Sequence, residues 1–252
     1  MDEIEVEQVD AAELDDPVFV EGLPGVGHVG KLVAEHLVEE MESTLVRRVY
    51  SEHFPPQVGI DEEGVGTLAH AEFYAIETDG RDVLVLTGNH QAGDGAGHYR
   101  LTETFLEIAD SFGATEIFAL GGVPTGELIE EYSVLGAVSD DEQIERLEDL
   151  GVEFRSEEPA GGIVGTSGLL LGMGGRSGFD AACLMGETSG YVVDPMSARA
   201  VLEVLEELID VEIDYEALDD RAEEMEEVLG RLKEMEAGPS PGGGDDDLRY
   251  IG

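Results

Sequence analysis

Short apolar runs alternate with amphipathic stretches along most of the chain. Residues 18–23 form an apolar run, residues 31–41 have the spacing of an amphipathic helix, and residues 45–50 are apolar again. Glycine, proline or acidic residues separate these segments, as expected of turns. The same rhythm predicts further strands at 82–86, 116–120 and 181–185, and further helices at 101–112, 142–150 and 196–209. Such an order is typical of βαβ units, in which helices connect parallel strands.

A longer alternation of apolar and polar positions covers residues 58–76 and differs from the rest. It includes Leu68, Ala71, Phe73 and Ala75, and its length predicts an antiparallel pair rather than a helical crossover. The expected fold class is therefore α/β. We predict a three-layer α/β/α arrangement around a mixed, mainly parallel sheet.

The pattern also predicts how the chain is divided. An acidic lead of residues 1–17 precedes one α/β domain of residues 18–210, and an amphipathic helix follows at 211–237. Apolar residues of that helix recur at alternating steps of four and three, namely Leu218, Ala222, Met225, Leu229 and Leu232. Such a seam packs either on its own domain or on another subunit, and the sequence leaves both open.

Residues 238–252 are predicted to form a flexible tail that ends in a docking peptide. The run GPSPGGG at 238–244 cannot continue a helix and has the composition of a flexible tether. The chain then closes with a predicted partner-binding peptide, Leu248, Arg249, Tyr250, Ile251 and Gly252. A disordered terminus is the alternative. Exposed tails are normally depleted in large apolar residues, and this favours docking.

The charge of the chain excludes two classes of partner. It has 59 acidic residues against 13 lysines and arginines, a formal net charge of -46 at pH 7. Nucleic acid and anionic membranes are repelled by such a surface, so we expect neither as a partner. Hydrophobic residues still make up 42% of the chain, which is enough for a core. Concentrated salt shortens the Debye length to about 3 Å at 1 M, so we expect a salt-adapted protein. Lys31 and Lys233 are the only lysines, a bias that we associate with salt-loving archaea, and an acidic protein of an ordinary cytosol is the alternative.

The compartment is predicted to be the reducing cytoplasm. Cys183 is the single cysteine and lies in an apolar run, so no intramolecular disulfide can form. The first residues do not have the basic and apolar regions of a signal peptide, and no apolar segment approaches the ~20 residues of a membrane span.

The turn after the first predicted strand combines glycines with a lysine. Gly25, Gly27 and Gly30 have the spacing of a dinucleotide-binding turn, and with Lys31 they also fit a phosphate-binding loop. Leu32 stands where that loop needs a hydroxyl group for magnesium. Glycines here also permit a tight turn and close packing of the following helix, which is the interpretation we favour. An anion or ligand loop remains the alternative.

A second glycine-rich segment, residues 89–99, follows another predicted strand. This is the edge of an α/β sheet at which ligands usually bind, so Asn89 and His90 are candidate ligand residues. His90, Asp94 and His98 have side chains that can bind metal, but the glycines between them predict a mobile loop. We expect neither a metal nor another cofactor.

Three landmarks occur in order along the chain: FVEGLPGVG at 19–27, IFALGG at 117–122, and GETSG at 186–190 leading into DPMSA at 194–198. Together they resemble the archaeal proteasome-assembly-chaperone family over residues 18–209. The resemblance implies a fold similar to those of phosphorylases and hydrolases. It also implies self-association into a small homo-oligomer, a trimer or a tetramer, and non-catalytic binding to proteasome α subunits.

The resemblance also bears on the tail. Proteasome activators and some members of this family end in a hydrophobic-Tyr-X peptide that inserts between α subunits. Here Tyr250 is third from the end, and Arg249 stands in the preceding hydrophobic place. The apolar contact would come from Leu248 or Ile251 in a shifted register.

Two enzymatic functions are the alternatives. A phosphorylase-like enzyme would bind phosphate at residues 25–30 and a nucleoside at residues 89–98. Phosphorolysis needs cations, and only Lys31 and Arg100 lie near these segments in the sequence. A nucleotide-dependent ligase or ATPase would use the same turn, but Leu32 and the lack of a strand-end aspartate for magnesium disfavour it.

Overall fold

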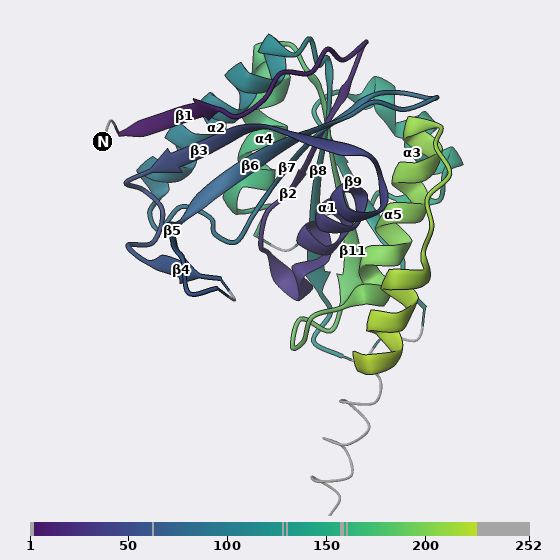
Figure 1. The fold of residues 1–252 in the computed structure, drawn as a ribbon. Coiled ribbons are helices and arrows are strands. Elements are labelled where there is room, and N and C mark those ends of the chain that lie inside the picture. The colour runs from purple at the N-terminus through teal and green to yellow at the C-terminus, as the bar shows by residue number, and fades with distance from the viewer. Residues whose placement is uncertain are drawn as a thin grey trace, which may run out of the picture.

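The computed structural model describes residues 3–61, 63–127, 129, 131–156, 159 and 161–225. The strands are β1 (Ile4–Gln8), β2 (Val18–Gly22), β3 (Ser43–Ser51), β4 (Val58–Ile60), β5 (Gly66–Leu68), β6 (His70–Ile76), β7 (Val83–Gly88), β8 (Glu116–Pro124), β9 (Val134–Val138), β10 (Val152–Glu153) and β11 (Asp180–Thr188). Within the described residues, nine of them form one sheet in the order β1-β3-β6-β7-β2-β8-β11-β9-β10 (Figure 1). The other two, β4 and β5, pair with each other outside this sheet.

The helices are α1 (Val29–Glu40), α2 (Gly95–Ser111), α3 (Ile144–Asp149), α4 (Gly165–Ser177) and α5 (Pro195–Ile209), with 3-10 turns at Val26–His28 and Asp141–Gln143. Each helix predicted from the pattern within the α/β domain is present, with ends that differ by a few residues. Helix α4 and strands β1, β9 and β10 are additional elements that the pattern did not predict.

The sheet is mixed, as predicted. Strands β7, β2, β8 and β11 lie side by side and run parallel, whereas β1, β3 and β6 form an antiparallel edge that joins β7. On the other side, β9 runs antiparallel to β11. In the described sheet four neighbouring pairs are parallel and four are antiparallel. The prediction of a mainly parallel sheet therefore holds for the four central strands, whereas the β1-β3-β6 edge and the β9–β11 pair are antiparallel.

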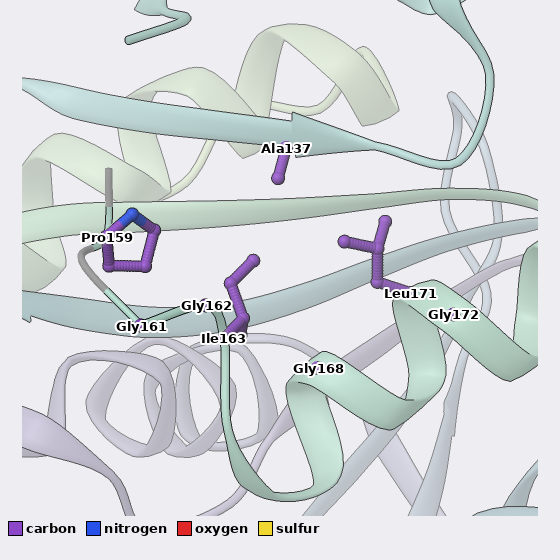
Figure 2. Close-up of a pocket in the computed structure, with 8 residues that line it drawn as sticks. All are labelled: Ala137, Pro159, Gly161, Gly162, Ile163, Gly168, Leu171 and Gly172. Carbon is purple, nitrogen blue, oxygen red and sulfur yellow. The ribbon is translucent and has the colours of Figure 1, made fainter. Parts of the chain in front are cut away.

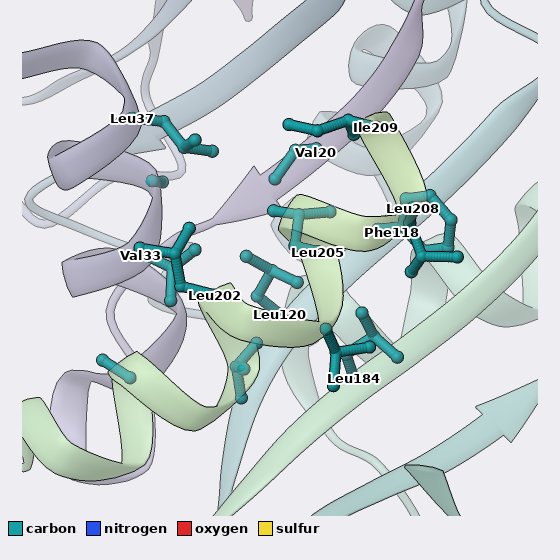
Figure 3. Close-up of a cluster of buried hydrophobic side chains, with 14 of the residues drawn as sticks. Val20, Val33, Leu37, Phe118, Leu120, Leu184, Leu202, Leu205, Leu208 and Ile209 are labelled. Atoms are coloured by element: carbon teal, nitrogen blue, oxygen red, sulfur yellow. The ribbon is translucent and has the colours of Figure 1, made fainter. Parts of the chain in front are cut away.

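Apolar side chains of the central strands alternate between two cores. Val18 and Val20 belong to the core under α1 and α5, while Phe19 belongs to the core under α2 and α4. Figure 3 shows the first core, where strand residues meet the apolar faces of α1 and α5. Its labelled members are Val20, Val33, Leu37, Phe118, Leu120, Leu184, Leu202, Leu205, Leu208 and Ile209. Both faces of the central sheet are covered, which confirms the three-layer α/β/α arrangement.

Aspartates fix the starts of two long helices. Asp94 accepts a hydrogen bond from the backbone N of Gly97 at 2.9 Å, and Asp194 accepts one from the N of Ser197 at 3.1 Å. Both are N-caps, which bind backbone donors that the helix leaves free. Residues 95–99 are consequently the first turn of α2. The loop predicted for residues 89–99 is therefore confined to residues 89–94, and its predicted mobility stays a prediction.

The acidic N-terminal lead contains a strand of the large sheet. Residues Ile4–Gln8 form β1, which pairs antiparallel with β3 along its whole length. Apolar Ile4 and Val6 alternate with Glu5 and Glu7, a pattern that suits an edge strand with one solvated face. The structure therefore joins this part of the predicted lead to the sheet of the α/β domain.

Part of the predicted C-terminal helix lies within the described residues. Residues 216–225 are helical, and the rest of the predicted helix and the whole tail lie outside the described part of the chain. Leu218 and Ala222 of the predicted seam are buried, and Leu218 belongs to the core under α1 and α5. Arg221 forms an ion pair with Glu39 of α1 at 2.9 Å. The described part of the seam thus packs on its own domain.

None of the described helices combines the length and the apolar composition that a membrane crossing requires.

Candidate functional site

The glycine turn after β2 lies where backbone segments approach very closely. A Cβ atom built on Gly22 would lie 2.1 Å from the carbonyl oxygen of Gly30. A Cβ on Gly30 would lie 2.4 Å from the oxygen of Leu120, and one on Gly122 would lie 2.4 Å from the oxygen of Val26. Real Cβ atoms do not approach backbone oxygens so closely, so each position requires glycine. These contacts support the architectural interpretation of this turn.

Hydrogen bonds join the same turn to the third landmark. The backbone N of Asp194 donates to the oxygen of Gly27 at 2.9 Å, and the Thr188 hydroxyl donates to the Asp194 carboxylate at 2.7 Å. Gly27 itself has φ +61°, a left-handed conformation that glycine adopts without strain. The three landmarks, far apart in the sequence, therefore meet at the carboxyl edge of the central strands.

Glu21, at the end of β2, is fully buried. Its Oε1 accepts a hydrogen bond from the N of Leu23 at 3.0 Å, and its Oε2 accepts one from the Ser167 hydroxyl at 2.9 Å. Burial raises the pKa of the Glu21 carboxyl to about 7, and these two hydrogen bonds offset only part of that effect. Glu21 thus links the turn after β2 to the first turn of α4.

Gln91 makes a second link between the same segments. Its amide nitrogen donates to the oxygen of Pro24 at 2.7 Å, and its amide oxygen accepts from the N of Thr166 at 3.1 Å. The two glycine-rich segments predicted as ligand loops are therefore neighbours, joined through Gln91. Sequence reasoning missed both Glu21 and Gln91 as linking residues, because their partners on α4 are 146 and 75 residues away.

The predicted ligand residues themselves do not converge on one point. Lys31 lies in the first turn of α1 and forms an ion pair with Glu35 one turn later. His90 lies in the loop between β7 and α2, and its Nε2 is 2.8 Å from the side-chain amide nitrogen of Gln57. Asn89, in the same loop, is exposed. Gly25 immediately precedes the 3-10 turn Val26–His28, Gly27 lies within it, and Gly30 packs on Leu120. Lys31 and His90 thus have partners on separate elements.

An apolar groove lies beside α4, between this helix and Ala137 of β9 (Figure 2). It has a volume of about 490 Å³ and is lined by glycines and aliphatic or proline side chains. The described lining residues are Ala137, Pro159, Gly161, Gly162, Ile163, Gly168, Leu171 and Gly172. None of them can neutralise a phosphate or transfer a proton.

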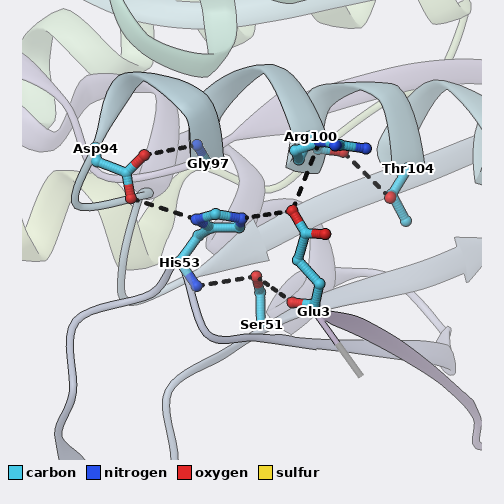
Figure 4. Close-up of polar contacts among 7 residues, drawn as sticks. All are labelled: Glu3, Ser51, His53, Asp94, Gly97, Arg100 and Thr104. Atoms are coloured by element: carbon cyan, nitrogen blue, oxygen red, sulfur yellow. Dashed lines mark hydrogen bonds and ion pairs between the residues drawn. The ribbon is translucent and has the colours of Figure 1, made fainter. Parts of the chain in front are cut away.

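A histidine lies between two carboxylates at the start of α2 (Figure 4). His53 Nδ1 is 3.3 Å from Asp94 Oδ2, and His53 Nε2 is 3.1 Å from Glu3 Oε1. The hydrogen bond with Glu3, followed by that with Asp94, raises the pKa of His53. Arg100 approaches Glu3 at 3.6 Å. Asp94, considered above as a metal ligand, is instead the partner of His53, and this cluster ties the start of β1 to α2.

The single thiol of the chain is not accessible. Cys183 is fully buried in the core under α2 and α4, and burial raises the pKa of its thiol. Among the described residues, no group of three or more histidine, cysteine or acidic side chains is arranged to hold a metal ion.

The protein thus belongs to a class of α/β proteins in which three glycine-containing segments pack against one another at the carboxyl edge of the central strands. Comparison with known proteins gives the family. The chain belongs to the PAC2 family, which matches residues 19–233. This confirms the resemblance that the three landmarks indicated.

Two solved structures from Pyrococcus furiosus are similar over nearly the whole chain. PbaB, an archaeal proteasome activator, has 38% sequence identity and a TM-score of 0.87, covering 92% of this chain and 100% of that one. PbaA, an archaeal homolog of proteasome-assembly chaperone, has 29% identity and a TM-score of 0.76, covering 92% and 93%. An uncharacterized protein of Methanocaldococcus jannaschii is 40% identical over 248 residues, covering 96% of this chain and 95% of that protein.

Proposed function

We propose that this protein is a non-catalytic proteasome assembly factor that binds proteasome α subunits. The observation that carries the proposal is the similarity to PbaB and PbaA over more than nine tenths of the chain. PbaB is a proteasome activator, and PbaA is a homolog of proteasome-assembly chaperone. The resemblance of the three landmarks points in the same direction.

The chemistry of the described residues supports action by contact rather than by turnover. The close backbone contacts at Gly22, Gly30 and Gly122 give these glycines a packing role that needs no bound phosphate. Lys31, the cation nearest to the turn after β2 in the sequence, is paired with Glu35. The groove beside α4 is apolar. A phosphorylase or an ATPase would need cations or metal ligands at one of these places.

The C-terminal peptide is proposed as the anchor. Removing Leu248 to Gly252 should weaken binding to immobilised α subunits by about tenfold or more, because a tethered peptide adds avidity to the contact made by the body. The matched control replaces Asp245, Asp246 and Asp247 by asparagine, which keeps the length of the tail and its last five residues. Pull-down in molar KCl, with the melting temperature as a check on folding, measures both.

Two results of that pull-down would count against the proposal. Retention of the truncated chain equal to that of the intact chain would contradict the role of the peptide. Failure of the intact chain to retain any α subunit would contradict the function itself.

Activation of the assembled proteasome is a second candidate. It is favoured because PbaB, described as an activator, has higher identity and a higher TM-score than PbaA. Peptide hydrolysis by assembled proteasome, with and without this protein, tests activation. The yield of complete particles from separate subunits tests assembly.

We also propose that the protein works in a cytoplasm with concentrated salt. The net charge of -46 opposes compaction unless counterions screen it. Raising KCl from roughly 0.1 M to 2 M should therefore raise the melting temperature by about 10 °C or more. Scanning calorimetry checks this, and a melting temperature that is constant or falls would contradict salt adaptation.

Self-association is the remaining part of the proposal. A homo-oligomer of three or four copies would present several C-terminal anchors to a ring of α subunits at once. Several weak contacts acting together raise the overall affinity.

A further inference from the structure

The β4–β5 hairpin lies outside both cores of the protein. Figure 1 shows it apart from the helices, at one side of the molecule. Each of its six strand residues is exposed. Two strands of three residues have too few contacts to be stable alone, and an isolated hairpin is marginal in water. Contact with another surface would therefore stabilise the hairpin.

One face of this hairpin is apolar. Val58 pairs with Leu68, and Ile60 pairs with Gly66. Residues two apart on a strand share a face, so Val58, Ile60 and Leu68 lie on the same side. Their exposed fractions are 54%, 74% and 52%. A Cβ on Gly66 would lie 2.9 Å from Val58 Cγ1, so Gly66 belongs to this side too and adds no polar group.

A groove opens at the base of the same face. It has a volume of about 460 Å³ and is lined mainly by apolar side chains that continue from the hairpin. The lining residues are Ser51, Glu52, Phe54, Pro55, Pro56, Gln57, Val58, Leu68 and Ala69. Val58 and Leu68 belong to both the groove and the apolar face. Ile60 lies two residues beyond Val58, about 7 Å further from the body.

This surface, which we call the hairpin patch, therefore holds both an apolar projection and an apolar recess. Ile60 is the projection, and the groove lined by Phe54 and Pro55 is the recess. Two copies facing each other about a two-fold axis can place each Ile60 in the groove of the other copy. A patch that is complementary to itself is the requirement for a two-fold interface.

The sparse charge of the hairpin patch allows two acidic copies to meet there. Two chains that each have a net charge of -46 repel each other, so they can meet only where charge is sparse. The apolar face has no ionisable side chain, and Glu52 is the one acidic residue among the described residues that line the groove. The acidic residues Asp61 and Glu63 follow β4 in the connecting turn, beyond the apolar face.

We propose that the hairpin patch is a two-fold contact between copies of this chain, with Ile60 of each copy in the groove of the other. This rests on the self-association part of the proposed function. A two-fold contact builds a dimer, or half of a tetramer with dihedral symmetry, and does not by itself build a trimer. Salt strengthens the contact, because it screens the repulsion and favours burial of apolar surface.

The test is the mass of the purified full chain in molar KCl, measured by sedimentation equilibrium. Ile60→Asp should at least halve the mass of the oligomer, because a charge in the groove leaves an unpaired carboxylate at the interface. Ile60 is exposed in the single chain, so the melting temperature of the monomer should be unchanged. The matched control is Val164→Asp, the same kind of change at a position that is 83% exposed, which should keep the wild-type mass.

A cross-link locates the contact independently of the mass. A copy with Ile60→Cys and a copy with Pro55→Cys, oxidised together, should form a disulfide-linked pair, whereas Val164→Cys in place of Pro55→Cys should not. The natural Cys183 is fully buried and does not compete.

Several results would overturn the proposal. These are a monomeric wild-type chain, an Ile60→Asp variant that keeps the wild-type mass, or an equal loss of mass in Val164→Asp. If Ile60→Asp keeps its mass but no longer binds α subunits, the hairpin patch contacts the proteasome instead. Because the mass is measured without proteasome subunits, failure here leaves the proposed function standing, and failure of the pull-down leaves this contact standing.

Discussion

Replacing Gly30 by alanine is expected to destabilise the protein by about 3 kcal/mol or more. A new Cβ at this position would lie 2.4 Å from the backbone oxygen of Leu120, and backbone cannot move aside as a flexible side chain can. Gly30 lies in helix α1, where alanine normally stabilises by about 0.5–1 kcal/mol relative to glycine. A loss of stability would therefore report the close contact between α1 and β8, not helix propensity.

Gly25 provides the matched control for this prediction. It belongs to the same turn, has extended backbone at φ -145°, and has open space around its Cβ position. Gly25→Ala should change stability by less than about 1 kcal/mol. Urea unfolding in molar KCl measures both variants. Equal stability of the two would contradict the architectural role of the turn and return it to consideration as a ligand loop.

Replacing Glu21 by glutamine is expected to stabilise the protein by about 3 kcal/mol above pH 7. Burial raises the pKa of this carboxyl from its usual 4.5 to about 7, so the folded state holds the proton more tightly than the unfolded state. Below about pH 4.5 Glu21 is protonated in both the folded and the unfolded state, and burying it costs no ionisation energy. As the pH rises from about 4.5 to about 7, the unfolded state loses the proton first and the free energy of unfolding falls. Above about pH 7 the full loss remains. The rise in the pKa from 4.5 to about 7 corresponds to a free-energy difference of about 3 kcal/mol. Glutamine has no proton to lose.

Glutamine also fits the hydrogen bonds that Glu21 makes. Its amide oxygen can accept from the N of Leu23, and its amide nitrogen can donate to the Ser167 hydroxyl. That hydroxyl lies 3.4 Å from the oxygen of Leu120, to which it can then donate. The difference in unfolding free energy between the two chains should therefore increase between pH 5 and pH 8.

The control is Glu5→Gln, the same change at an exposed position of the edge strand, which should alter stability by less than about 0.5 kcal/mol. A Glu21→Gln variant that is less stable than wild type at pH 8 would show that the fold stabilises an ionised Glu21. The first turn of α4, which supplies Ser167, would be the structural source of that stabilisation.

The hydrophobic pattern was sufficient to predict the central strands and most of the helices. Continuous apolar runs such as Val83 to Leu86 are buried on both faces, and this is why they could be recognised without knowing their neighbours. Helix α4 could not be recognised in this way, because its composition is unusual for a helix. Helix α4 contains five glycines, including Gly168 and Gly172, and glycine is a poor helix former.

The packing of α4 explains why a helix with so many glycines is present. A Cβ on Gly175 would lie 2.5 Å from Ser139, and one on Gly174 would lie 2.9 Å from Ile117. Glycine lets this helix approach the sheet closely, and tertiary packing then outweighs propensity. Local sequence contains no information on such long-range contacts.

The candidate site was predicted only in part. The glycines of the turn after β2 were recognised. The preferred reason for them, a tight turn and close packing, agrees with the contacts of Gly27 and Gly30, whereas Gly25 has open space around its Cβ position. Glu21 was missed because a single acid within an apolar strand has no local signature. Its importance comes from Ser167, which the chain brings beside it through the packing of α4. The residues predicted to bind partners, Leu248 to Gly252, lie outside the described part of the chain.

The turn after β2 packs closely at Gly22 and Gly30, and the grooves beside α4 and at the hairpin patch are lined mainly by apolar side chains. The contacts proposed for the protein are at its surface. The acidic charge makes any association dependent on salt. The hairpin patch would join copies of the chain, and the proposed C-terminal peptide would join those copies to another particle. Both proposed contacts would serve the assembly of protein particles and not the turnover of a substrate.

Sedimentation velocity of the full chain mixed with proteasome α subunits in molar KCl tests this account most directly. The account predicts a saturable complex with a dissociation constant of about 1 μM or tighter, formed without added nucleotide or metal. Separate sedimentation of the two proteins at concentrations of tens of micromolar would contradict it.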